Sequence, residues 1–230
     1  SATIDDEIKD LAYSLVKNPI RIQVSPKDPV SKNVDHSVMF VGMNDKRFFL
    51  ERMVNENPAS KILVFVRTKV RCERIQAAME RVGITSVFMH GGKEQQDRLT
   101  VLNTFKQGKV KLLIATDVSA RGIDIPDVDF VVNYDLPEHP ENYVHRVGRT
   151  GRGVKKGMAY SFCDDAEKDL LRDIEDYIGK KIKIINLAKD DYKEITDLTS
   201  EKKMNLKQIL EELTPVPNKR YGVKKSKMNK

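Results

Sequence analysis

The chain has 230 residues, a length that allows one or two domains with a buried core. Hydrophobic residues make up 40% and charged residues 33% of the chain, and no run of 18 apolar residues occurs, so we predict no membrane span. The formal net charge of +7 favours a polyanionic partner.

Two segments precede the part of the chain in which strands and helices alternate. Residues 1–24 begin SATIDDEIKD, which is acidic and polar and unlike a signal peptide. They combine a predicted helix at residues 5–17 with a strand-like stretch, IRIQV. Residues 25–33, SPKDPVSKN, are rich in proline and polar side chains, a composition typical of a linker.

Strands and helices alternate over residues 34–188. Apolar runs predict strands at residues 37–41, 61–66, 86–90, 111–116, 129–135 and 157–162. Helical spacing predicts helices at residues 44–57, 68–81, 94–106, 141–146 and 165–179, the first with Asn44 as its N-cap. This alternation predicts an α/β fold in which a mostly parallel sheet carries helices on both faces.

The pattern weakens from residue 189 onward. Residues 205–213, NLKQILEEL, are compatible with one more short helix. The end of the chain indicates a disordered basic tail, since it contains no acidic residue but carries Lys219, Arg220, Lys224, Lys225, Lys227 and Lys230. A solubilising end and a segment that attracts RNA or DNA both remain open for it.

Polar residues follow the predicted strands, at the edge where parallel sheets bind ligands. RTK follows residues 61–66, HGG follows residues 86–89, and TDVSARGID follows residues 111–115. In that last stretch Gly122 permits a close backbone approach, Asp124 can accept hydrogen bonds from ribose hydroxyls, and Thr116 suits a phosphate. The plain alternative is a strand, a turn and a helix capped by the aspartate.

The stretch YVHRVGRTGRG places Arg146, Arg149 and Arg152 three residues apart, with glycines between them. Like charges at this spacing repel, so we expect their counter-charge to come from outside the chain. A guanidinium fork matches phosphate oxygens, and the glycines would let the backbone bring all three arginines to one face. The alternative is a solvated basic loop.

Six motifs, SAT, VFVRTK, MHGGKEQQDR, ATDVSARGIDIP, YDLP and HRVGRTGRG, together resemble the carboxyl-terminal RecA-like domain of a DEAD-box RNA helicase. The resemblance covers residues 34–186, and the motifs and basic tail are similar to those of the bacterial RhlE-like group. It implies a RecA-like three-layer sandwich with a mostly parallel central sheet. Neither G-x-x-x-x-G-K-[ST] nor D-E-A-D occurs, so we expect a part of a longer helicase.

In that frame residues 1–24 would be the tail of the preceding RecA-like domain and residues 25–33 the interdomain linker. Residues 34–188 would be the helicase carboxyl-terminal domain, and residues 189–230 an extension with the basic tail. The chain alone is then expected to hydrolyse no ATP.

The resemblance implies roles for individual residues. The residues implied to reach the ATP γ-phosphate as catalytic arginines are Arg149 and Arg152. Those implied to lie beside the ATP ribose and the attacking water are Gly122 and Asp124. Those implied to couple the two domains are Ser1, Ala2, Thr3, His145 and Arg146. Those implied to contact the RNA backbone are Thr68, Gly91, Gln95, Arg98 and Thr116.

The resemblance also implies the cofactors and partners. ATP would bind between two RecA-like domains, with Mg²⁺ held mainly by the first of them. RNA, as single strand or duplex, would be bound without sequence preference. We expect a monomer with no membrane partner. Two alternatives stay open: a non-catalytic RNA-binding or protein-docking module, and a DNA helicase domain of the same fold.

Other chemistry-bearing residues point to structural roles. The four histidines lack metal-ligand spacing, so no metal site is predicted. Cys72 and Cys163 lack it too and indicate reduced thiols in a cytoplasmic protein. Tyr134 is expected to pack in the core rather than to stack on a base. The carboxylates of Asp164, Asp165 and Glu167 are expected at a helix N-terminus.

Overall fold

The computed structural model describes residues 6–16, 30–117, 128–151 and 156–198. No helix within these ranges is long and apolar enough to cross a membrane. Several predictions lie outside the described residues, namely those for Ser1, Ala2, Thr3, the strand IRIQV, most of the linker, Gly122, Asp124, Arg152, residues 205–213 and the basic tail.

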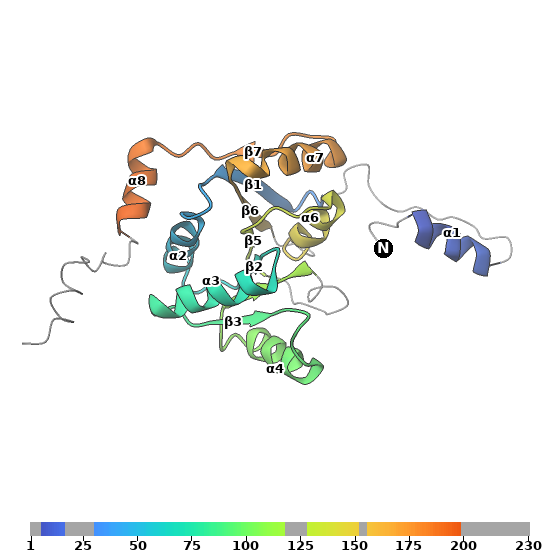
Figure 1. Cartoon of the computed structure of the whole chain (residues 1–230), viewed down its shortest axis with the longest axis horizontal. Helices are drawn as coiled ribbons and strands as arrows, with labels where there is room; N and C mark the ends of the chain where they lie inside the picture. Colours follow the sequence, from blue (N-terminus) through green and yellow to red (C-terminus); the bar gives the residue numbers. More distant parts are fainter. Residues whose placement is uncertain (1–5, 17–29, 118–127, 152–155, 199–230) are drawn as a thin grey trace, which may run out of the picture. The chain divides into compact units, whose positions relative to one another are not determined.

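A seven-stranded sheet with strand order β3-β4-β2-β5-β6-β1-β7 forms the centre of the fold (Figure 1). Its strands are β1 Val34–Phe40, β2 Ile62–Phe65, β3 Ser86–Met89, β4 Leu112–Ala115, β5 Phe130–Asn133, β6 Gly157–Cys163 and β7 Lys183–Ile184. Every neighbouring pair is parallel. Strands β2 and β4 are buried at all positions, as their unbroken apolar sequences predict.

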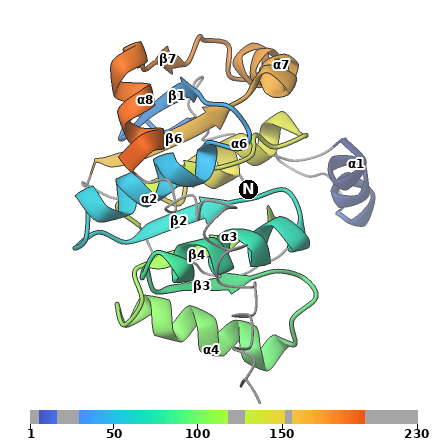
Figure 2. The same cartoon turned by 60° about the vertical axis from the view of Figure 1, so that its left-hand side comes forward.

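Helices cover both faces of this sheet. Their bounds are α2 Lys46–Glu56, α3 Lys69–Arg81, α4 Gln95–Lys106, α6 Pro140–Val147, α7 Lys168–Ile178 and α8 Lys189–Leu198, and a further helix, α1 Asp6–Leu15, precedes them in the chain. One core cluster joins the sheet to α2, α3 and α8, and the other joins it to α4, α6 and α7 (Figure 2). The predicted α/β sandwich is therefore confirmed.

Two elements had not been predicted, the short edge strand β7 and helix α8. The ring of Tyr192 on α8 lies 5.1 Å from that of Phe49 on α2. Its hydroxyl accepts a hydrogen bond from the Gly42 backbone at 3.0 Å and donates one to Asp45 at 2.7 Å. The first residues of the predicted extension thus pack on the sheet domain.

The starts of two helices test local predictions. Helix α2 begins after Asp45, so Asn44 as N-cap was wrong. The carboxylates before α7 do form a helix start: Asp164 and Glu167 make a reciprocal capping box on the 3₁₀ turn Asp165–Glu167 that leads into α7.

Candidate functional site

Among the predicted site residues that the structure describes, Arg146 is the most completely enclosed charge. Its side chain is 1% exposed, and Nε and one terminal nitrogen each donate to a carboxylate oxygen of Asp117 at 2.7 Å. The other terminal nitrogen donates to the Asp135 backbone carbonyl at 2.7 Å and to the Asn133 side chain at 3.3 Å. The guanidinium therefore has a two-pronged ion pair and two further acceptors.

Helix α6 explains this position. Tyr143, Val144 and Val147 turn toward the core, and Arg146 shares that buried side of the helix. The guanidinium also lies over the Phe65 ring, 5.1 Å from its centroid. The expectation that all three arginines need a counter-charge outside the chain was wrong for Arg146, since Asp117 supplies it. Its predicted interdomain role stays a prediction.

Arg149 lies just after α6 on a segment that the fold holds through its backbone. The Arg149 carbonyl accepts a hydrogen bond from the Val128 backbone at 3.2 Å, and the buried Thr150 hydroxyl donates to the Val128 carbonyl. Val128 precedes β5, so this segment sits at the amino end of that strand. The Arg149 side chain is half-buried.

Gly151 and Gly157 let this segment approach the sheet. Gly151 has φ +69°, and a Cβ there would lie 2.8 Å from the Asn33 carbonyl oxygen. A Cβ on Gly157 would lie 2.2 Å from the Thr150 hydroxyl oxygen. Glycine at these two positions therefore lets the segment after α6 lie directly against the sheet.

The arginine stretch is consequently divided between two ends of the sheet. The Arg146 guanidinium reaches residues that follow β4 and β5, whereas Arg149 lies beside residues that precede β5. The expectation that all three arginines meet on one face stays a prediction, because Arg152 lies outside the described residues and it is the backbone of Arg149 that lies at the amino end of β5. His145 is half-buried on α6 between them.

The residues expected to contact RNA follow β2, β3 and β4, which are neighbours in the sheet. Thr68 caps α3, its hydroxyl accepting from the Arg71 backbone at 3.2 Å. Gln95 opens α4 and accepts from Arg98 at 3.0 Å. Gly91 and Gln95 are exposed, and Thr116 is buried at 6% exposure. Thr68 is also exposed and Arg98 is half-buried. These four residues, unlike Thr116, therefore have side chains or backbone at the surface, on the loops after the strands and at the start of α4.

His90 fixes the HGG loop after β3. Its Nδ1 accepts a hydrogen bond from the Gly92 backbone at 3.1 Å, so Nε2 carries the proton and donates to Glu73 at 3.0 Å. The ring is 6% exposed. This histidine therefore acts as a support for exposed Gly91.

A second ionic cluster, which the sequence analysis did not single out, lies where β1, β2, β5 and β6 end. The buried Asp135 carboxylate accepts from the Arg67 backbone at 2.9 Å and from the Arg71 guanidinium. Glu167, 2% exposed, accepts from Arg67 at 3.0 Å and from the fully buried Lys46. In the sequence, the indication of this cluster was that Asp135 in YDLP and Arg67 in RTK come at the ends of predicted strands.

The remaining candidates are structural in the part of the chain that is described. Tyr134 is 6% exposed and packs edge-on against Phe162, which confirms its predicted role in packing. Burial raises the pKa of the Cys72 and Cys163 thiols from 9.0 to about 12, and neither forms a disulfide. Within the described ranges no cluster of metal-ligating side chains occurs.

Comparison with known proteins places this arrangement in a family. The family described as helicase conserved C-terminal domain matches residues 45–154. The chain is 37% identical over 190 residues to the ATP-dependent RNA helicase RhlB of Shewanella amazonensis, covering 83% of this chain and 43% of RhlB. The chain spans less than half the length of the curated relatives it matches. Membership of the RhlE-like group stays a prediction.

Solved structures agree with this assignment. The structure of S. cerevisiae Dbp5 bound to RNA and ADP BeF3 has a TM-score of 0.74 at 32% identity, over 86% of this chain and 52% of that one. The C-terminal domain of the DEAD-box protein Dbp5 has a TM-score of 0.64 at 33% identity, over 72% of this chain and 96% of that one. The chain therefore belongs to the DEAD-box helicase family and corresponds to its carboxyl-terminal, second RecA-like domain.

Proposed function

We propose that this chain is the part of an ATP-dependent RNA helicase that supplies an arginine to ATP held by the first RecA-like domain. The observation that carries the proposal is the contrast between Arg146, sealed on Asp117, and Arg149, half-buried on a segment pinned by Thr150. A rigidly placed guanidinium can stabilise the charge that develops on a γ-phosphate. Arg152 would act beside Arg149.

The Arg146–Asp117 ion pair connects two segments of the proposed ATP site. Asp117 opens the stretch that contains Gly122 and Asp124, the residues proposed to border the ATP ribose and the attacking water. Arg146 therefore ties the start of that stretch to the helix that ends just before Arg149. In this proposal Mg²⁺ comes with ATP and is held by the first domain, with Ser1, Ala2, Thr3 and His145 at the contact between domains.

RNA is the proposed second ligand of the site. Thr68, Gly91, Gln95 and Arg98 lie on loops and helix starts after neighbouring strands, suited to a sugar-phosphate backbone. Thr116, which is buried, would contribute through its backbone. Such contacts position RNA without reading its sequence. Binding of ATP and RNA together would close the two domains and separate a short duplex locally. The monomeric state and the cytoplasmic location stay predictions.

The proposal is tested by ATP turnover of the parent enzyme, with the first domain present, measured with and without RNA. We expect RNA to raise turnover and Arg149→Ala to abolish it, while a fluorescent ATP analogue still binds. Arg172→Ala is the matched control, because Arg172 on α7 is 68% exposed and pairs with Asp169 on the same helix. ATP turnover that is the same with and without RNA would refute the proposal that RNA is a ligand of this site. The absence of ATP turnover would favour a non-catalytic module.

Two further comparisons separate the remaining alternatives. Stronger stimulation by duplex DNA than by duplex RNA would favour a DNA helicase domain of the same fold. The chain by itself is expected to show no turnover with or without RNA, and measurable turnover by the purified chain would contradict a γ-phosphate site shared with another domain.

A further inference from the structure

The turn between β3 and α4 determines the positions of three residues proposed to contact RNA. A hydrogen bond from the Lys93 backbone to the His90 carbonyl, at 3.1 Å, closes this turn. Gly91 lies within the turn, and α4, which carries Gln95 and Arg98, begins two residues after Lys93. A change in the turn would therefore move all three RNA-contact candidates.

The His90 imidazole closes the same turn a second time. Its Nδ1 accepts a hydrogen bond from the Gly92 backbone N–H at 3.1 Å, and the residue is 6% exposed. A Cβ on Gly92 would lie 3.2 Å from Nδ1, so the backbone packs directly against the ring. A backbone N–H can only donate, so this hydrogen bond exists only while Nδ1 carries no proton.

Charged groups of both signs lie around this imidazole in the part of the chain that is described. Its Nε2 donates to the carboxylate of Glu73 on α3 at 3.0 Å. The ammonium group of Lys69, also on α3, would lie 3.4 Å from a Cβ on Gly92. The Lys93 ammonium lies 3.8 Å from the centroid of the Phe88 ring, and that ring lies 5.5 Å from the imidazole. A protonated imidazole would keep its pair with Glu73 but would face these two ammonium groups.

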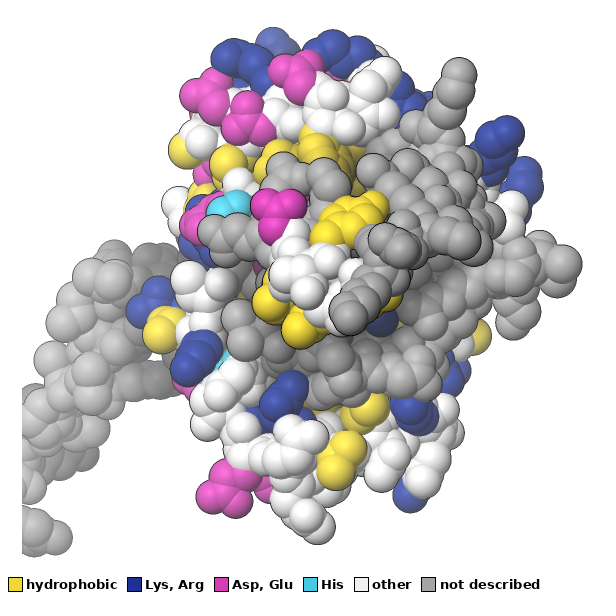
Figure 3. All heavy atoms as spheres, turned by 90° about the vertical axis from the view of Figure 1, so that its right-hand side faces the viewer, with side chains coloured by type: hydrophobic (Ala, Val, Ile, Leu, Met, Phe, Trp, Pro, Cys, Tyr) yellow, Lys and Arg dark blue, Asp and Glu magenta, His cyan; other side chains and the backbone are white. Residues whose placement is uncertain are grey.

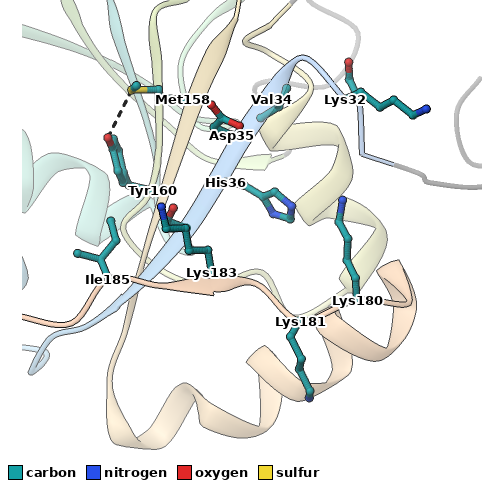
Figure 4. Close-up of a pocket in the computed structure, with 12 residues that line it drawn as sticks. Lys32, Val34, Asp35, His36, Met158, Tyr160, Lys180, Lys181, Lys183 and Ile185 are labelled. Atoms are coloured by element: carbon teal, nitrogen blue, oxygen red, sulfur yellow. Dashed lines mark hydrogen bonds between the residues drawn. The ribbon is translucent and has the colours of Figure 1, made fainter.

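A second histidine, His36 on β1, provides a contrast. It lies at the hollow between β1 and β7 that Figure 4 shows, and its Nδ1 is 2.9 Å from the Tyr143 hydroxyl oxygen. A hydroxyl can donate to a neutral imidazole, or rotate and accept from a protonated one. Protonation therefore preserves the hydrogen bond of His36 with Tyr143, whereas it breaks the one between His90 and Gly92.

Acid ordinarily strengthens the binding of a polyanion to a protein. On the face shown in Figure 3, Asp and Glu side chains lie among Lys and Arg along the upper margin. Protonation of surface carboxylates or histidines makes a protein more positive and increases its attraction for phosphates. A loss of RNA affinity in acid would therefore identify a group that must be neutral when RNA binds.

We propose that His90 is a positioning residue for RNA binding and that it acts only in its neutral form. Neutral Nδ1 holds the Gly92 N–H, and the closed turn presents Gly91 and the start of α4 to the RNA backbone. Protonation places a second donor opposite Gly92, and the turn opens. An imidazole ordinarily changes charge between about pH 5 and pH 8, so RNA affinity is full above this range and falls as the pH drops through it. The inference rests on the proposed function for RNA as the ligand.

Hydrogen exchange of the Gly92 amide tests the turn without RNA. Its protection factor is measured by NMR on the full chain at about pH 7.5 and about pH 5.5, each corrected for the intrinsic exchange rate. We expect protection to fall about fivefold at the lower pH, the equivalent of one net hydrogen bond. His90→Asn should keep protection at both, because an asparagine oxygen accepts from the backbone two residues further on. Equal protection at both pH values in the unsubstituted chain would overturn the proposal.

RNA affinity tests the consequence for binding. Anisotropy of a fluorescein-labelled oligouridylate is measured at the same two pH values with the parent enzyme, which contains the first domain, and a non-hydrolysable ATP analogue. We expect affinity to fall about fivefold in acid for the unsubstituted enzyme, to stay high for His90→Asn and to be low at both pH values for His90→Ala. His36→Asn is the matched control and should behave as the unsubstituted enzyme does. Affinity that rises in acid, or that falls equally in His90→Asn, would contradict a role of the neutral imidazole.

A further variant separates this inference from the proposed function. Gln95→Ala removes a proposed RNA contact but leaves the hydrogen bonds of His90 in place, so it should weaken oligouridylate binding at both pH values. Weakened binding by Gln95→Ala, together with normal binding by His90→Ala, would overturn the positioning role alone. Normal binding by Gln95→Ala would count against the proposed RNA contacts, and the protection of the Gly92 amide would still decide whether His90 controls the turn.

Discussion

Arg146 and Arg149 belong to one sequence motif and lie three residues apart, yet the fold treats them differently. Arg146 is 1% exposed and bound through both prongs to Asp117, and Arg149 is half-buried on a segment whose backbone is fixed by Val128 and Thr150. The first charge is used to join two strand ends. The second is the arginine that we propose acts on ATP, so in this proposal one residue of the motif stabilises the fold and another takes part in catalysis.

The largest effect on folding is expected from Arg146→Ala, which tests whether Arg146 stabilises the fold more than Arg149 does. The change leaves the Asp117 carboxylate and two buried acceptors without their donor, and removing one partner of a buried pair lowers the free energy of unfolding by about 3–5 kcal/mol. Arg149→Ala is expected to lower it by less than about 1 kcal/mol. Urea unfolding of both variants measures the difference.

Arg146→Lys serves as the control for charge. Lysine restores the positive charge but cannot reproduce the two-pronged contact, so we expect only partial recovery of stability. Equal stability of the Arg146→Ala and Arg149→Ala variants would contradict the division of roles.

The buried Lys46–Glu167 ion pair tests the same structural role for a charge outside the arginine stretch. Lys46 is fully buried and also donates to the Tyr134 carbonyl at 2.9 Å. Lys46→Ala removes one of the two cations that pair with the buried Glu167 carboxylate, the other being Arg67, and is expected to cost about 3 kcal/mol. Adding Glu167→Gln should cost less than the sum of the single changes, as a double-mutant cycle in urea would show. Strict additivity would mean that the two side chains do not support one another.

Gly151→Ala tests whether the arginine segment depends on its close approach to the sheet. Alanine would have to adopt φ +69°, and its Cβ would lie 2.8 Å from the Asn33 carbonyl oxygen. We therefore expect the free energy of unfolding to fall by about 2 kcal/mol. Gly83→Ala is the matched control, because Gly83 has φ +77° but open space around it, and should lose about 1 kcal/mol. Equal losses, compared by thermal unfolding, would show that strain and not contact sets the effect.

The smallest effect concerns the buried thiols. Because burial raises the pKa of Cys72 and Cys163 to about 12, the folded state keeps protons that the unfolded state releases near pH 9.0. Their contribution is fully present below pH 9 and is lost as the pH rises toward 12. We expect urea midpoints to fall between pH 8 and pH 10, and to fall less in Cys72→Ala/Cys163→Ala. The same decline in both proteins would contradict this assignment.

Much of the fold follows from local sequence. Continuous apolar runs such as that of β2 predict buried strands, and Gly83 and Gly108 adopt the positive φ that is typical of glycines just after helices. The two-residue strand β7 could not be predicted, since it forms only by pairing with β1. Helix α8 depends on the contact of Tyr192 with Phe49, far away in the sequence.

The sequence identified candidate residues for the site but could not identify the residues that they contact. Arg146 was identified, but its pairing with Asp117 joins residues 29 positions apart that no local pattern connects. Lys46 and Glu167 are 121 positions apart, and each looked like an ordinary helix residue. Contacts between residues far apart in the sequence decide which charge becomes buried. A sequence motif therefore indicates the kind of chemistry, but not which of its residues is buried in a structural ion pair.

The most direct test of the central claim measures ATP turnover by the parent enzyme, with RNA, for Arg149→Ala and for Arg172→Ala, with the melting temperature of each. The account predicts that Arg149→Ala lowers turnover about 10³-fold or more with an unchanged melting temperature, while Arg172→Ala changes neither. Turnover by the Arg149→Ala enzyme within a few-fold of the unsubstituted enzyme would contradict the account and move the catalytic role to Arg152 or away from this stretch.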